Sequence, residues 1–270
     1  MSEIAGQHVL ITGGASGIGR LMAQKFVALG GRVSLWDIHR ENLDKTVAEL
    51  NATARQPVRG YLCDVSKRAV VYRVAEEMQA AAGAVDILVN NAGVVSGARL
   101  LDLADEKIEA TMAINTLSLF WTAKAFLPRM IERNHGHVVT IASAAGLIGV
   151  AKLTDYATSK WAAVGFDESL RAELRQIAPG VKTTIVCPYF INTGMFHGVK
   201  TRFSWLLPIL EEDDVASRIV SAIRRGKRRL WVPPFVYTIP PMRLLPVAVF
   251  DWLATFFGVN ASMDEFKGRG

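Results

Sequence analysis

A tyrosine and a lysine stand four residues apart, at 156 and 160, in the run Tyr-Ala-Thr-Ser-Lys. Residues at this spacing share one face of a helix, so we expect both side chains to enter the same cleft. A phenol titrates near pH ~10. An ammonium about 4 Å away contributes at most about 4 kcal/mol at an effective dielectric near 20, roughly three pK units before desolvation opposes it. The pair therefore predicts a Tyr156 with a pKa near neutral that exchanges a proton with an alcohol or carbonyl oxygen.

Two more polar residues complete a candidate catalytic group. Ser143 follows an apolar run and lies thirteen residues before Tyr156. Its hydroxyl can hold a substrate oxygen while charge develops there. Asn115 lies inside a helical pattern, where asparagine is a poor helix former. We expect Asn115 to kink that helix and to hold a water that connects Lys160 to solvent.

A glycine-rich segment, Thr-Gly-Gly-Ala-Ser-Gly-Ile-Gly at 12–19, follows the first strand-like run and opens a helical pattern. Glycines allow a sharp turn and a close approach of backbone N–H groups to a pyrophosphate, and the helix N-terminus favours the same anion. In this context the segment predicts a dinucleotide-binding loop. The expected contacts come from five residues, namely Gly13, Ser16, Gly17, Ile18 and Gly19.

Asp37 ends the second strand-like run about 20 residues after the loop, and Ile38 follows it. A carboxylate there can accept both ribose hydroxyls of the adenosine and would repel a 2′-phosphate. No basic residue takes the place of Ser16 inside the loop. These residues favour NAD over NADP.

Further candidate cofactor contacts follow the third and fourth strand-like runs. Asp64 and Val65 can hold the adenine, and Asn91, Ala92 and Gly93 would let the cofactor lie against the backbone. In parallel sheets, ligands bind beyond the carboxyl ends of the strands, which places these residues together.

Strand-like and helical patterns alternate along the chain, which predicts an α/β fold with a doubly wound parallel sheet covered on both faces. The expected strands are 8–11, 32–36, 58–62, 86–90, 136–141 and 181–186, with a possible seventh at 229–232. The expected helices are 18–29, 41–50, 67–82, 105–133 with a break at Asn115, and 156–176. We find no linker and predict one domain, 1–270.

The tail departs from this rhythm, because from 230 to 260 only Arg243 and Asp251 are charged and five prolines interrupt the apolar sequence. A membrane-spanning helix needs about 20 unbroken apolar residues. The prolines exclude that and leave a helix at about 247–257. It can form a lid or a subunit contact, or it can lie on a membrane or meet a lipophilic substrate.

The net charge of +6 arises in part from five basic residues within 224–229. This cluster is either a solvated helix end or a contact for anionic lipid headgroups, and no nucleic-acid module accompanies it. Cys63 and Cys187 end apolar runs and are expected to be buried free thiols. The first residues have no secretory pattern, which predicts a cytoplasmic protein with peripheral membrane contact as an alternative.

Together the motifs at 12–19 and 90–93, Asn115, Ser143, Tyr156-x-x-x-Lys160 and Pro188 resemble the short-chain dehydrogenase/reductase (SDR) family over about 5–195. The resemblance implies a Rossmann-like domain with seven parallel strands. It implies Tyr156 as the acid/base, Lys160 on the nicotinamide ribose and on Tyr156, Ser143 on the substrate oxygen, and Asn115 on the relay water. It also implies a homodimer or homotetramer built through the helices at 105–133 and 156–177.

Two segments, 35–38 and 187–196, resemble the branch with retinol and hydroxysteroid dehydrogenases. In that branch the nicotinamide would contact Pro188, and its carboxamide would contact Ile191 and Thr193. Residues 196–228 would form an apolar lid and the following helix. Residues 229–270 would form the last strand and the hydrophobic tail.

The leading hypothesis is an NAD(H)-dependent oxidoreductase that interconverts an alcohol and a carbonyl on a lipophilic substrate such as a steroid, a retinol or an aliphatic alcohol. Two alternatives are an NADPH-dependent keto-acyl or ketone reductase and a non-catalytic NAD-binding scaffold at a membrane. His135 and His137 stand near a turn without cysteine or paired carboxylate, so we predict no metal site.

Overall fold

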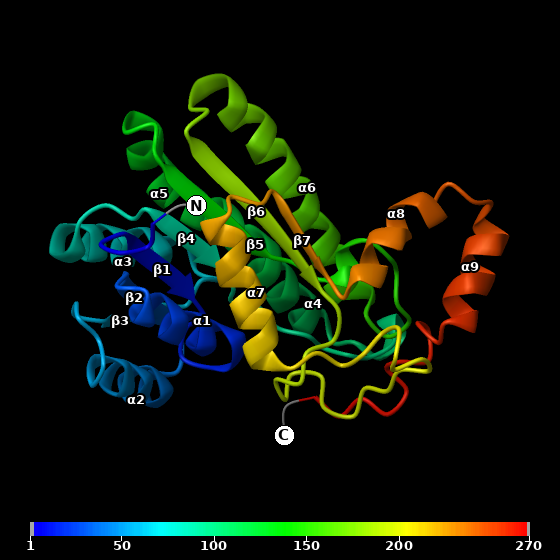
Figure 1. The fold of residues 1–270 in the computed structure, drawn as a ribbon. Coiled ribbons are helices and arrows are strands. Elements are labelled where there is room, and N and C mark those ends of the chain that lie inside the picture. The colour runs from blue at the N-terminus through cyan, green and yellow to red at the C-terminus, as the bar shows by residue number, and fades with distance from the viewer. Residues whose placement is uncertain (1–2, 269–270) are drawn as a thin grey trace.

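The computed structural model describes residues 3–268, so the outermost two residues at each end of the predicted domain lie outside the described residues. Within that range seven parallel strands form one sheet in the order β3-β2-β1-β4-β5-β6-β7 (Figure 1). This confirms the predicted fold and the seventh strand. The strands are β1 (His8–Thr12), β2 (Arg32–Asp37), β3 (Arg59–Leu62), β4 (Ile87–Asn90), β5 (Gly136–Ile141), β6 (Val181–Pro188) and β7 (Arg229–Val232).

Helices cover both faces of the sheet (Figure 1). On one face α1 packs against α7, and on the other α3 packs against α5, beside α6. The helices are α1 (Gly17–Ala28), α2 (Arg40–Asn51), α3 (Arg68–Ala82), α4 (Asp105–Met112), α5 (Ser118–Glu132), α6 (Thr154–Ile177), α7 (Glu212–Arg224), α8 (Ile239–Met242) and α9 (Val247–Phe256).

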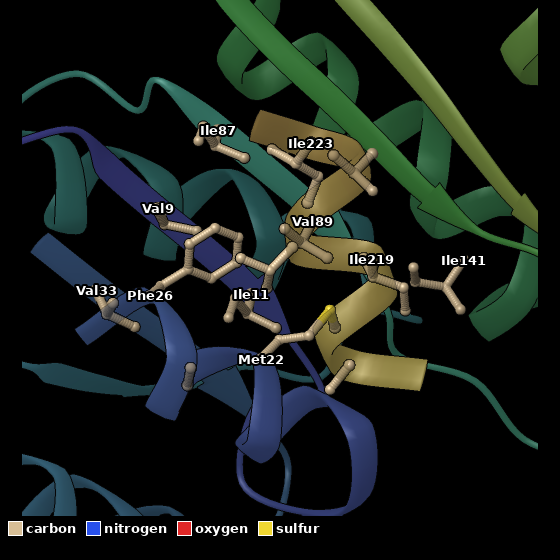
Figure 2. Close-up of a cluster of buried hydrophobic side chains, with 14 of the residues drawn as sticks. Val9, Ile11, Met22, Phe26, Val33, Ile87, Val89, Ile141, Ile219 and Ile223 are labelled. Carbon is tan, nitrogen blue, oxygen red and sulfur yellow. The ribbon is translucent and has the colours of Figure 1, made fainter. Parts of the chain in front are cut away.

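The central strands are buried on both faces because they lie between two layers of helices, and their sequences are accordingly rich in Val and Ile. Figure 2 shows the core between the sheet and the α1–α7 pair. Met22 and Phe26 of α1 and Ile219 and Ile223 of α7 are fully buried there. Full burial contributes about 1.5–3 kcal/mol for each such side chain, which fixes α1 and the loop before it on the sheet.

The strand order reverses between β1 and β4, because β2 continues the sheet from β1 on one side and β5 continues it from β4 on the other. A crevice opens at the carboxyl ends of strands where the order reverses. The glycine loop follows β1, and Asn91 follows β4. The fold therefore places both motifs at the same crevice.

The predicted break in the helix at 105–133 is a π-helical segment, η2 (Ala113–Leu117), between α4 and α5. π-helical turns are rare and occur mostly as single-turn bulges. Asn115 is at the centre of this segment and is buried. The prediction of an interruption at Asn115 is confirmed.

The tail after β7 folds as short pieces, a 3₁₀ segment η4 (Pro234–Thr238) and then α8 and α9, as its prolines require. Helix α9 matches the predicted 247–257. Among residues 3–268 no helix is long and apolar enough to span a bilayer. Cys63 and Cys187 are buried free thiols, as predicted.

Candidate active site

Helix α6 presents Tyr156 and Lys160 to one cleft, as their spacing predicts, and both side chains are buried. The Lys160 Nζ lies 5.6 Å from the centroid of the Tyr156 ring. It donates a hydrogen bond of 3.0 Å to the carbonyl oxygen of Ile141, at the end of β5. Strand β5 thereby anchors the ammonium beside the phenol ring.

The predicted pKa of Tyr156 is wrong for the protein alone. Burial raises the pKa of Tyr156 to about 12, and a hydrogen bond with Ser143 lowers it only in part. Burial also lowers the pKa of Lys160, to about 8. The near-neutral pKa was predicted from the attraction between ammonium and phenolate, with desolvation taken as the smaller effect. In the folded protein desolvation prevails, because both groups are enclosed.

Ser143 occupies the turn between β5 and α6. Its Oγ accepts a hydrogen bond of 3.1 Å from the backbone N–H of Ala145, which caps the short helical turn Ala144–Gly146. The Ser143 side chain also acts on the Tyr156 phenol, whose pKa it lowers. Both side chains line the cleft, where a substrate oxygen could contact both hydroxyls.

The Asn115 amide is fully engaged by protein groups. Its Oδ1 accepts from the backbone N–H of Val94 at 2.9 Å, and its Nδ2 donates to the Val94 carbonyl at 2.9 Å and to Ser159 Oγ at 3.0 Å. Asn115 therefore joins the segment after β4 to α6. The relay water remains a prediction, and the amide itself has no free donor for it.

A cleft of about 1,210 Å³, counting its part open to solvent, runs along the carboxyl ends of the strands from β3 to β6. Every residue predicted to contact the cofactor lines it. They are Gly13, Ser16, Gly17, Ile18, Gly19, Asp37, Ile38, Asp64, Val65, Asn91, Ala92, Gly93, Tyr156, Lys160, Pro188, Ile191 and Thr193.

The glycine loop requires glycine where φ is positive and where the backbone of a neighbouring residue leaves no room for a Cβ. Gly13 and Gly17 have φ values of +61° and +49°, a region that side chains disfavour. A Cβ on Gly19 would lie 2.2 Å from the carbonyl oxygen of Gly13, so α1 starts in direct contact with the loop. Asn91 Nδ2 donates to the carbonyls of Thr12 and Gly13, at 2.9 and 3.0 Å.

Thr12 is a residue that sequence reasoning missed. Its Oγ1 accepts hydrogen bonds of 3.0 Å from the backbone N–H groups of Asn91 and Ala92, which ties the end of β1 to the segment after β4. Its position at the start of the glycine motif is the signal that could have identified it.

The two carboxylates of the cleft are held by local bonds. Asp37 is buried, and its oxygens accept from the backbone N–H groups of Ala15 and His39, each at 3.0 Å. Asp64 accepts from the backbone N–H and the hydroxyl of Ser66, at 2.9 and 2.6 Å. Asp37 therefore faces the adenosine end of the cleft in a fixed orientation.

These features fit a nicotinamide dinucleotide. The loop and the α1 N-terminus suit a pyrophosphate, and Asp37 suits a ribose diol. A Cβ on Gly93 would come within 3.4 Å of Lys160 Nζ and 3.3 Å of Asn115 Oδ1, so the wall beside Lys160 has no side chain and can admit a flat ring.

A second cavity of about 770 Å³, again counting its open part, adjoins this cleft. The two share Ser143, Tyr156, Tyr189 and Phe196. None of the described lining side chains is charged. The distant wall comes from the tail and consists of Phe235, Val236, Ile239, Met242, Phe250, Ala254, Phe257, Val259 and Ser262.

Within the predicted lid segment, Phe196 and Leu207 line the apolar cavity. Phe203 instead packs against Phe256 and Phe257 of the tail, and Trp205 is 80% exposed. The lid and the tail thus pack on each other, and together they enclose the cavity. Sequence spacing could not predict that Met242 and Phe250 would line the same cavity as Tyr156.

The two histidines near β5 have ordinary structural environments. His135 is exposed, whereas His137 is buried and bonds Thr184 Oγ1 through Nε2 at 2.7 Å. Within residues 3–268 no group of three or more His, Cys, Asp or Glu side chains is arranged to hold a metal ion.

Comparisons with known proteins agree with this geometry. The family model described as short chain dehydrogenase matches residues 7–202. Epidermal retinol dehydrogenase 2 of Mus musculus is 44% identical over 269 residues, covering 99% of this chain and 87% of that protein.

Two solved structures are similar throughout the fold. One is a short-chain dehydrogenase/reductase from Burkholderia phymatum in complex with NAD, with a TM-score of 0.82, 28% identity and coverage of 92% and 96% of the two chains. The other is a metagenomic short-chain oxidoreductase in complex with NADP, with a TM-score of 0.72, 30% identity and coverage of 86% and 98%. The chain therefore belongs to the short-chain dehydrogenase/reductase family, as a dinucleotide-dependent oxidoreductase in the branch that contains the retinol dehydrogenases.

Proposed function

We propose that the chain is an NAD(H)-dependent oxidoreductase that interconverts an alcohol and a carbonyl on a lipophilic substrate, with Asn115, Ser143, Tyr156 and Lys160 as its catalytic group. One observation carries the proposal: Tyr156 and Ser143 stand where the dinucleotide-shaped cleft meets the uncharged cavity. A substrate in that cavity would present its oxygen to both hydroxyls.

The residues divide the chemistry between them. Ser143 holds the substrate oxygen, and Tyr156 donates a proton to it or accepts one from it. The raised pKa of Tyr156 keeps the phenol protonated at neutral pH, which suits proton donation to a carbonyl. Lys160 supplies positive charge beside the phenol, which favours phenolate when an alcohol is oxidised. A nicotinamide dinucleotide held by the glycine loop and Asp37 would supply the means of hydride transfer.

The choice of NAD over NADP is supported by Asp37. Its carboxylate lines the adenosine end of the cleft and would repel a 2′-phosphate. Dinucleotide titrations with NAD and NADP, followed by tryptophan fluorescence, test this choice. Tighter binding of NADP would favour the alternative, an NADPH-dependent keto-acyl or ketone reductase.

The substrate class is supported by the composition of the second cavity and by the retinol dehydrogenase relative. A cavity of about 770 Å³ without a charged wall suits a retinol-, steroid- or long aliphatic-alcohol-like molecule. A panel of such alcohols and their carbonyls, with both directions measured by NADH absorbance, identifies the class. Turnover confined to short polar alcohols would contradict it.

The catalytic role of Tyr156 is tested by Tyr156→Phe, which removes one oxygen and keeps the ring. We expect turnover to fall at least about a thousandfold while the Kd of NAD changes little, because proton exchange is lost and the cleft is kept. Tyr72→Phe, on α3 and away from both cavities, is the matched control. Retained turnover in Tyr156→Phe would refute the acid/base role. Absence of turnover in the parent protein would favour the non-catalytic scaffold.

We also propose a homodimer or homotetramer built through the helices at 105–133 and 156–177. Exposed apolar side chains on these helices support it, including Leu117, Phe120 and Trp161. Sedimentation velocity of the parent and of Phe120→Glu tests the interface. A monomeric parent at micromolar concentration would contradict it.

Peripheral membrane contact is proposed for the outer side of α9. Phe250 and Ala254 point to the cavity, whereas Val247 and Trp252 are 75% and 61% exposed. Co-sedimentation with vesicles containing anionic lipid is expected for the parent and not for Trp252→Glu, with Ile177→Glu, at the far end of α6, as control. Equal binding by both variants would exclude this face. The two free cysteines suit a reducing compartment such as the cytoplasm.

A further inference from the structure

A buried carboxylate lies directly before the proposed acid/base. Asp155, in the first turn of α6, is 4% exposed. Its Oδ2 accepts hydrogen bonds from the hydroxyls of Ser96 and of Thr111, the latter at 2.9 Å. Its Oδ1 is buried and has no hydrogen-bond partner within residues 3–268. The side chain lines neither cavity.

Three segments of the active site meet at this carboxylate. Ser96 belongs to the segment after β4, which forms one wall of the dinucleotide cleft as far as Val94. Thr111 is in α4, four residues before Asn115 of the π-helical segment. Asp155 itself is on α6 next to Tyr156. One oxygen atom thus joins the cleft wall, the helix before the π segment and the first turn of α6.

A second chain of bonds runs parallel to this junction. Asn115 bonds both backbone groups of Val94 and also Ser159 Oγ. Ser159 Oγ in turn donates to the carbonyl oxygen of Tyr156 at 2.7 Å. The turn that carries Tyr156 is therefore tied to the cleft wall at two points, through Asn115 and through Asp155.

Holding three segments together through a buried carboxylate costs free energy. A buried polar group costs free energy unless its hydrogen bonds are satisfied, and here one carboxylate oxygen is left without a partner. The N-terminal end of α6 favours a negative charge and offsets part of that cost. An apolar contact could join the segments at lower cost, but it would not fix their relative orientation by directed bonds.

We propose that Asp155 is a positioning residue for the reaction, which sets the phenol of Tyr156 against the dinucleotide cleft through its bonds to Ser96 and Thr111. The inference rests on the proposed function, because it assigns Tyr156 the proton transfer. Asp155 contacts neither substrate nor cofactor. Loss of its bonds lets the first turn of α6 shift relative to the cleft wall, and displacements of about 1 Å at a reacting group can reduce rates by about a hundredfold.

The test compares Asp155→Ala with Asp155→Asn in the full chain. Asp155→Ala is expected to lower kcat about ten- to a hundredfold, with the Kd of NAD changed less than about threefold. The oxygen of Asp155→Asn can still accept from both hydroxyls, so this variant is expected to keep kcat within about threefold of the parent. Rates are measured per folded protein, and thermal unfolding is recorded for each variant.

A double-mutant cycle gives a second test that survives poor folding of Asp155→Ala. Thr111→Val and Ser96→Ala each remove one donor, and we expect each to lower kcat. In the Asp155→Asn background, Thr111→Val and Ser96→Ala should lower kcat by the same factor as in the parent. In the Asp155→Ala background, the same two substitutions should lower kcat little further. Parental kcat in Asp155→Ala, or losses that add fully in that background, would overturn the inference. So would losses of stability alone.

The Tyr156→Phe variant separates the two proposals. If Tyr156→Phe abolishes turnover and Asp155→Ala does not reduce it, the proposed function stands and the positioning role of Asp155 fails. If Tyr156→Phe keeps turnover, both proposals fail, because Asp155 then has no proton-transfer group to position.

Discussion

Replacement of Lys160 by Met should make the protein more stable at neutral pH and remove its activity. Lys160 is buried, and burial lowers its pKa from 10.5 to about 8. A pKa change of one unit corresponds to about 1.4 kcal/mol. Burial of the charged ammonium therefore opposes folding by about 3 kcal/mol. Met is unbranched, similar in length and apolar, so it removes this opposition without a large cavity.

The sign of the pH dependence follows from the direction of the pKa change. The unfolded chain binds the proton more tightly than the native state, so stability rises with pH between the two pKa values. The opposition is complete below pH 8 and disappears as the pH rises to 10.5. The variant also loses the hydrogen bond to the Ile141 carbonyl, which costs about 1 kcal/mol. The net gain at pH 7 is about 2 kcal/mol.

The assay is thermal unfolding of parent and Lys160→Met at pH 7 and pH 10.5. A gain of about 2 kcal/mol corresponds to a Tm about 5 °C higher at pH 7. At pH 10.5 the gain in Tm should vanish or reverse. The buried charge no longer opposes folding of the parent there, and the variant still lacks the hydrogen bond of Lys160. Lys124→Met, on the exposed side of α5, is the control and should show no such crossing. A lower Tm at pH 7, or the same gain at both pH values, would refute the reasoning.

Two further predictions concern the dinucleotide cleft. Asp37→Asn removes the negative charge and keeps the shape, so the preference for NAD over NADP in kcat/KM should fall at least about tenfold. Asp64→Asn is the matched control and should weaken both dinucleotides alike; an unchanged ratio in Asp37→Asn contradicts the role of its charge. Gly19→Ala places a Cβ 2.2 Å from the Gly13 carbonyl oxygen, so the loop must shift and the Kd of NAD should rise at least about tenfold. Gly165→Ala, whose Cβ meets nothing within 4 Å, should keep the parental Kd.

The elements of the fold were accessible from the sequence because each depends on a local pattern. Apolar runs of strand length alternate with helical periodicity, and this alternation predicts parallel strands through crossover connections. The break at Asn115 was predictable for the same reason, since it lies within one helix. Where a strand or long helix was predicted, the differences lie at its ends; for example, β6 continues to Pro188 instead of ending at 186. The short helical pieces Pro234–Thr238 and α8 were not predicted.

Residues at motif positions were equally accessible. Tyr156 and Lys160 had to share a face because four residues separate them on one helix. Gly13 directly follows β1 and Asp37 ends β2, and a parallel sheet brings the carboxyl ends of its strands to one edge. For these residues, spacing along the chain is nearly equivalent to position in space.

Other properties of the site depend on contacts between segments that are remote in sequence, and only the tertiary structure decides them. The pKa of Tyr156 follows from enclosure by the lid and the tail, and the spacing of residues along the chain does not reveal that enclosure. Phe250 and Ser143 line the same apolar cavity, although they are 107 positions apart in the sequence. The bonds of Asp155 to Ser96 and Thr111 likewise cross three elements. Spacing determines which residues share a helix or a strand end, whereas burial and directed bonds between elements exist only once the chain has packed.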